Sequence, residues 1–104
     1  MFCIMLKEIT PEELILNNSP LSIQLIDIRE PYELTDGYIL GNTNIPMGDI
    51  LDKRDQLSKT KDIIIYCNTG RRSKPVVYML KKLYNISAYN LKGGYKNFLK
   101  VIAK

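Results

Sequence analysis

The chain has 104 residues, of which 45% are hydrophobic and 25% charged, as is typical of a globular protein with one core of modest size. We therefore expect residues 1–104 to form a single domain. No apolar run approaches the roughly 18 residues of a membrane span, and the apolar start at 1–6 lacks the features of a signal peptide, so a cytoplasmic protein without a membrane partner is expected. The net charge of +4 is unevenly distributed: ten of the eleven acidic residues precede Lys59, and eleven of the fifteen basic residues lie from Lys59 on.

The first half of the chain predicts short elements separated by turns. Cys3 is interpreted as packing in a first strand. Thr10 as N-cap and Pro11 at the first helical position predict a helix that ends near Asn17. In chain order there follow a strand over Ile23–Ile28, a short helix over Pro31–Leu34, an extended piece at Asn44–Pro46, and a helix over Asp49–Leu57 with Ile50, Leu51 and Leu57 inward.

The second half alternates strands and helices more regularly. It predicts a buried strand over Asp62–Tyr66, a helix over Ser73–Tyr84, a strand over Ser87–Leu91 and a last helix over Tyr95–Ala103. The stripe expected to face inward on the first of these helices is Val76, Val77, Leu80, Leu83 and Tyr84. This alternation predicts an α/β fold with an open, mainly parallel sheet and helices on both faces.

Cys67 begins the segment with the clearest chemistry. It follows a buried strand, and Asn68, Thr69, Gly70, Arg71 and Arg72 separate it from Ser73, the expected N-cap. Ligands of open α/β sheets bind beyond the carboxyl ends of the strands, where this thiol lies. Backbone amides, two guanidiniums and a helix N-terminus would hold an anion there and favour the thiolate. An inert, buried cysteine is the alternative, but it leaves Gly70 and the two arginines unexplained.

These residues occur in segments that resemble the rhodanese-like domains, the single-domain sulfurtransferases. The resemblance covers about Leu6 to Leu99 and rests on five segments, which are ITPEEL (9–14), LIDIRE (25–30), GYILG with NIP (37–46), YCNTGRRS (66–73) and NLKGG (90–94). Tyr38 and Leu40 stand where the family usually has His and Pro, and Tyr95 and Phe98 stand where it often has Trp. These departures lie at packing and turn positions.

The resemblance implies a parallel five-stranded sheet and a catalytic Cys67 that carries sulfane sulfur as a persulfide. The donor would be a small anion such as thiosulfate or another persulfide, and the acceptor a thiol, cyanide or a protein. Substrate binding would fall to Asn68, Thr69, Gly70, Arg71, Arg72 and Ser73. Gly70 would let the loop bend back with a positive φ or with close backbone approach. Asp27 and Arg29 are interpreted as a structural ion pair that braces the loop, with direct substrate contact by Arg29 as the alternative.

Two other functions remain open on the same residues. Cysteine phosphatases and related arsenate reductases place five residues between Cys and Arg, whereas four separate Cys67 from Arg72. A non-catalytic binding module of the same family would usually lack the cysteine. No cofactor or metal is expected, because the chain has no histidine and only two distant cysteines. The lysines from Lys81 on are spaced as a solvated helix face without interleaved aromatics, which disfavours nucleic acid as a partner.

Overall fold

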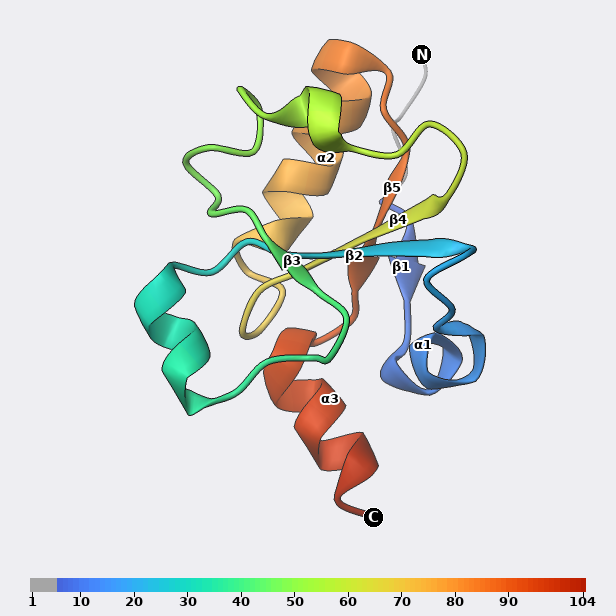
Figure 1. The fold of residues 1–104 in the computed structure, drawn as a ribbon, viewed down its shortest axis with the longest axis vertical. Coiled ribbons are helices and arrows are strands. Elements are labelled where there is room, and N and C mark those ends of the chain that lie inside the picture. Colours follow the sequence, from blue (N-terminus) through green and yellow to red (C-terminus); the bar gives the residue numbers. More distant parts are fainter. Residues whose placement is uncertain (1–5) are drawn as a thin grey trace.

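Five parallel strands form the central sheet, in the order β1-β5-β4-β2-β3. A computed structural model describes residues 6–104 (Figure 1), so the strand predicted around Cys3 lies outside the described residues. The strands are β1 (Glu8–Ile9), β2 (Ile23–Asp27), β3 (Thr43–Asn44), β4 (Asp62–Tyr66) and β5 (Ala88–Leu91). The helices are α1 (Pro11–Asn17), α2 (Ser73–Tyr84) and α3 (Gly94–Ile102), with 3₁₀ helices η1 (Pro31–Asp36) and η2 (Arg54–Gln56). The predicted α/β class and its parallel sheet are confirmed.

The helices cover both faces of this sheet, as predicted. Figure 1 shows α2 on one side of the strands and α1 with α3 on the other. Side chains alternate between the two faces along β4, because successive residues of a strand point in opposite directions. Ile63 and Ile65 pack in the cluster beneath α2, while Ile64 and Tyr66 pack in the cluster beneath α1 and α3. The strand is buried on both sides, which explains its unbroken apolar run.

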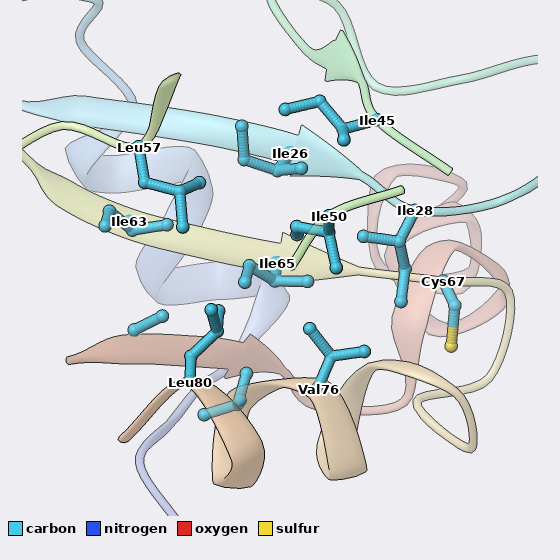
Figure 2. Close-up of a cluster of buried hydrophobic side chains, with 12 residues drawn as sticks. Ile26, Ile28, Ile45, Ile50, Leu57, Ile63, Ile65, Cys67, Val76 and Leu80 are labelled. Carbon is cyan, nitrogen blue, oxygen red and sulfur yellow. The ribbon is translucent and has the colours of Figure 1, made fainter. Parts of the chain in front are cut away.

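Cys67 continues the alternation of β4 by one step. It belongs to the same buried cluster as Ile63 and Ile65, and Figure 2 shows its sulfur just past the strand end, beside the turn that leads into α2. The register of β4 therefore determines that the thiol faces α2 rather than α3.

Local signals placed the first helix correctly. The Thr10 hydroxyl accepts a hydrogen bond from the Glu13 amide at 3.1 Å, and the Glu13 carboxylate accepts one from the Thr10 amide at 2.9 Å. This reciprocal pair is a capping box, which satisfies two amides that the first helical turn would otherwise leave unpaired.

The helix predicted over Asp49–Leu57 is wrong. Turns and the three-residue η2 occupy this segment, and the amides of Gln56 and Leu57 bond to carbonyls only three residues back. Gly48 and the aspartates that follow are weak helix formers. Ile50 and Leu57 are nevertheless buried in the cluster beneath α2, so the predicted inward direction holds without the predicted helix.

The last turn of α2 also differs from the prediction. Val76, Val77 and Leu80 are buried, but Leu83 is 57% exposed and Tyr84 38% exposed. The Tyr84 ring instead packs against the Arg54 guanidinium, 3.9 Å from the ring centroid. The inward stripe therefore ends one turn before the helix does.

No helix between residues 6 and 104 is long and apolar enough to cross a membrane.

Candidate functional site

The Cys67 thiol lies inside the loop that joins β4 to α2. Its sulfur accepts a hydrogen bond from the Gly70 amide at 3.0 Å, and the Ser73 hydroxyl oxygen lies 3.4 Å away. Gly70 has φ of +94°, a conformation that favours glycine, and this bend turns its amide back onto the sulfur. The predicted positive φ at Gly70 is confirmed. Cys67 itself has no exposed surface, whereas the neighbouring Asn68 and Thr69 are exposed.

The loop favours the ionised form of this thiol. Burial by itself raises the pKa of Cys67, but the Ser73 hydroxyl and the amides of Ser73, Arg72 and Thr69 outweigh burial, so that the pKa is lowered. Hydrogen bonds to the charged form are what stabilise a buried thiolate. The Gly70 amide and the Ser73 hydroxyl give this sulfur polar contacts, unlike the apolar surroundings of an inert structural cysteine.

Ser73 is not the N-cap of α2, contrary to the prediction. It is the first helical residue, and Arg72 occupies the cap position without a side-chain capping bond. The buried Ser73 hydroxyl donates instead to the side-chain oxygen of Asn90 on β5, at 2.5 Å. Asn90 in turn donates to the Glu8 carboxylate on β1, at 2.9 Å.

Arg72 reaches across to η1 and pairs with Glu33. Its two terminal nitrogens donate to the two carboxylate oxygens at 2.7 and 2.8 Å. The hydrogen bond from Arg72 is the main cause that lowers the pKa of Glu33 to about 2. That same pairing is the main cause that raises the pKa of Arg72, and the nearby Cys67 thiolate raises it further. Arg71 is exposed. Of the two predicted arginines, Arg72 thus lies beside the sulfur.

Asp27 and Arg29 form the structural ion pair that the sequence predicted. Both are buried, and the guanidinium binds the carboxylate through Nε at 3.1 Å and Nη2 at 2.8 Å. Arg29 also donates to the Gly37 carbonyl at 2.9 Å, and its guanidinium stacks over the Tyr95 ring at 4.7 Å. The bond to Gly37 fastens the C-terminal end of the η1 segment, which carries Glu33, to the end of β2.

The first turn of α3 holds the other side of the loop. The Tyr95 amide donates to the Cys67 carbonyl and the Lys96 amide to the Asn68 carbonyl, both at 2.9 Å. Gly94 permits this approach: its φ is +66°, and a Cβ there would lie 2.6 Å from the Cys67 and Asn68 carbonyl oxygens.

Four residues of this site were not predicted from the sequence as site residues, namely Glu8, Glu33, Asn90 and Gly94. Asn90 and Gly94 occur there only within the segment NLKGG of the resemblance, although a pair of glycines before a helix is a signal for close backbone approach. Between residues 6 and 104, no group of three His, Cys, Asp or Glu side chains is placed to hold a metal ion.

Comparisons with known proteins identify chains of similar sequence. A sequence model described as the rhodanese-like domain matches residues 10–100. The uncharacterized protein YqhL of Bacillus subtilis is 39% identical over 75 residues, which are 72% of this chain and 60% of that protein. A protein of Allochromatium vinosum named sulfurtransferase is 34% identical over 73 residues, which are 69% of this chain and 67% of that protein.

Solved structures give the same result. A rhodanese-related protein from Thermoplasma volcanium superposes with a TM-score of 0.82 at 27% identity, covering 91% of this chain and 92% of that one. A rhodanese-like domain protein from Staphylococcus aureus superposes with a TM-score of 0.78 at 33% identity, and the match covers 89% of this chain and 91% of that one. The match over 10–100, the shared parallel sheet and these relatives together show that the chain belongs to the rhodanese-like domain family.

Proposed function

We propose that this protein is a sulfurtransferase that carries sulfane sulfur as a persulfide on Cys67. The observation that carries the proposal is the position of the Cys67 sulfur at the carboxyl edge of the sheet. There it accepts a hydrogen bond from the Gly70 amide, and Arg72 lies beside it. A thiolate within a ring of amides is both a nucleophile and a site that tolerates the anion formed after attack. Relatives named sulfurtransferase support the same class of reaction.

Thiosulfate is the simplest donor for this site. The Cys67 thiolate attacks the outer, sulfane sulfur; a bond forms between the two sulfurs, the original sulfur–sulfur bond breaks, and its electron pair leaves with sulfite. An acceptor thiolate or cyanide then attacks the bound sulfur and regenerates the Cys67 thiolate. Both steps bring two anions together, so fixed positive charge and amide donors are needed beforehand. Arg72 and the amides from Asn68 to Ser73 would supply them.

The buried sulfur adds one requirement to this mechanism. Because Cys67 has no exposed surface, the donor can reach it only after neighbouring residues move, and we expect the exposed loop residues Asn68 and Thr69 to move with them. The Gly70 amide, now bonded to the cysteine sulfur, would pass to the added sulfur in the persulfide. Gly70 is suited to this shift, since glycine has the widest backbone freedom.

Phosphatase activity is the rival function, and the geometry favours it less. A phosphate has several oxygens that each need a donor, whereas here only four residues separate Cys67 from Arg72, one fewer than in the cysteine phosphatases. We expect the protein to hydrolyse an aryl phosphate only at the background rate.

Mass spectrometry of the intact protein tests the proposal directly. After incubation with thiosulfate, the wild type should gain the mass of one sulfur atom, and the Cys67→Ala variant should gain none. Thiosulfate:cyanide turnover should likewise disappear in Cys67→Ser. Unchanged turnover in Cys67→Ser, or robust hydrolysis of an aryl phosphate by the wild type, would overturn the assignment.

A further inference from the structure

The buried Asn90 side chain connects the catalytic loop to the edge of the sheet. Asn90 on β5 lies in register with Glu8 on the parallel strand β1, so the two side chains emerge on the same face. Its Nδ2 donates to Glu8 Oε2 at 2.9 Å, and its Oδ1 accepts the hydroxyl of Ser73. Ser73 Oγ then lies 3.4 Å from the Cys67 sulfur. One hydrogen-bonded path therefore runs from an exposed carboxylate to the thiol.

The charge of Glu8 determines the direction of every bond along this path. An ionised carboxylate only accepts hydrogen bonds, so the amide nitrogen of Asn90 must face it. The amide oxygen of Asn90 then faces Ser73, and the Ser73 hydroxyl must donate to it. A serine hydroxyl has a single proton, so the proton that points to Asn90 is unavailable to the sulfur. What Ser73 presents to Cys67 in this arrangement is a lone pair.

This arrangement withholds one donor from the Cys67 thiolate, which still has the Gly70 amide. Ser73 stabilises the thiolate only if its hydroxyl proton turns towards the sulfur. That turn leaves the buried oxygen of Asn90 without a donor, which is unfavourable for a buried polar atom. The lowering of the Cys67 pKa by the Ser73 hydroxyl is therefore realised only after Asn90 has lost its bond.

We propose that Glu8 and Asn90 are positioning residues that hold the Ser73 proton away from the Cys67 sulfur and so restrain formation of the nucleophile. They act through Ser73 and touch no substrate. The inference deepens the proposed function, since a sulfurtransferase needs the thiolate, but the ionisation of Cys67 can be measured without any sulfur transfer.

Other charged groups around the loop act on the thiol in parallel. Arg72 lies beside the sulfur and is paired with Glu33 from η1, and both remain in every variant below. Lys74 of α2 approaches Gly70, with its Cε 3.9 Å from where a Cβ would stand. On the α3 side, the exposed Lys96 is bound to the loop through its backbone amide. Their contribution is constant in a comparison that changes only Glu8.

Glu8→Gln is the informative substitution. Glu8 is exposed, and Gln has nearly the same shape but can donate as well as accept. The Asn90 amide can then reverse, donate to Ser73 Oγ and release the hydroxyl proton to the sulfur. We expect the pKa of Cys67 to fall by about one unit, a tenfold change in the ionisation constant. The measurement is a pH titration of thiolate ultraviolet absorbance, with the matching Cys67→Ala protein as blank.

Two controls separate this path from a simple loss of negative charge. Glu12→Gln removes the same charge from an exposed position on α1 that has no contact with Asn90, and should leave the Cys67 pKa unchanged. In a Ser73→Ala background the path is cut, so Glu8→Gln should then have no effect. If Glu8→Gln shifts the Cys67 pKa equally with and without the Ser73 hydroxyl, Glu8 acts only through its charge. If Glu8→Gln does not shift the Cys67 pKa in the wild-type background, Glu8 does not act on the thiol at all. Either result overturns the proposal.

The outcome is distinguishable from failure of the proposed function. If sulfur loading from thiosulfate is absent but the thiol titration behaves as described, the positioning pair stands and the sulfurtransferase assignment falls. If sulfur loading occurs but Glu8→Gln leaves the thiol titration unchanged, the sulfurtransferase assignment stands and the positioning role of Glu8 and Asn90 falls.

Discussion

Gly94 provides a sharp test of how α3 supports the loop. Its φ of +66° costs a residue with a side chain about 1–2 kcal/mol. An alanine Cβ would also lie 2.6 Å from the carbonyl oxygens of Cys67 and Asn68, which are backbone atoms and cannot rotate away. The loop must then move, and the bonds from the Tyr95 and Lys96 amides, both 2.9 Å, would lengthen or break.

The expected cost follows from these contacts. Each lost backbone hydrogen bond contributes about 0.5–1.5 kcal/mol, so Gly94→Ala should destabilise the protein by about 2–5 kcal/mol in total. Gly41→Ala is the matched control: Gly41 also has a positive φ, +89°, but no other atom lies within 4 Å of the added Cβ. It should cost about 1–2 kcal/mol, from the conformation alone.

Denaturant unfolding of the two variants and the wild type measures these differences, provided that the slope with denaturant is unchanged. A second readout is specific to the site: Gly94→Ala should diminish sulfur loading of Cys67, and Gly41→Ala should preserve it. If the two substitutions destabilise equally, the contact between α3 and the loop contributes nothing, and the explanation given for Gly94 is wrong.

Four other substitutions test the ion pairs and the arginines. Arg29→Met leaves Asp27 buried without its partner and should cost about 3–5 kcal/mol in unfolding experiments; a loss below 1 kcal/mol would argue against the bracing role. Pairing with Arg72 lowers the pKa of Glu33 from 4.5 to about 2, so this pair stabilises the fold above the unfolded pKa, and its contribution is lost as the pH falls from about 4.5 towards 2. Glu33→Gln should flatten the pH dependence of stability in that window by about 1 kcal/mol, the range of partly exposed pairs; an unchanged curve would mean that the pair contributes nothing. Arg72→Ala should lower kcat/KM for thiosulfate by about one to two decades, and the exposed Arg71→Ala by less; equal and negligible effects would mean that amides alone bind the donor.

Local sequence signals were reliable where the physical cause lies within one or two turns of chain. The N-cap signal of Thr10 followed by Pro11 acts within one helical turn, and the apolar run of β4 acts between adjacent residues. Both were sufficient to place α1 and the strand that ends at Cys67. Over Asp49–Leu57 the predicted inward direction of Ile50 and Leu57 is confirmed, but the predicted helix is wrong. Turns can bury two side chains as well as a helix can, so their apolar character did not determine the secondary structure.

The sequence alone therefore determined the strand, the loop with Cys67 and Gly70, and the helix that follows. The tertiary structure decided which side chains complete the site. Glu33 is 39 residues from Arg72, and Asn90 is 82 residues from Glu8 and 17 from Ser73. Parallel strands bring such distant residues into register through long crossovers, which leave no short-range pattern. Ser73 shows the consequence: it was expected to cap its own helix, but it is the first helical residue, and its hydroxyl donates to the Asn90 oxygen on β5.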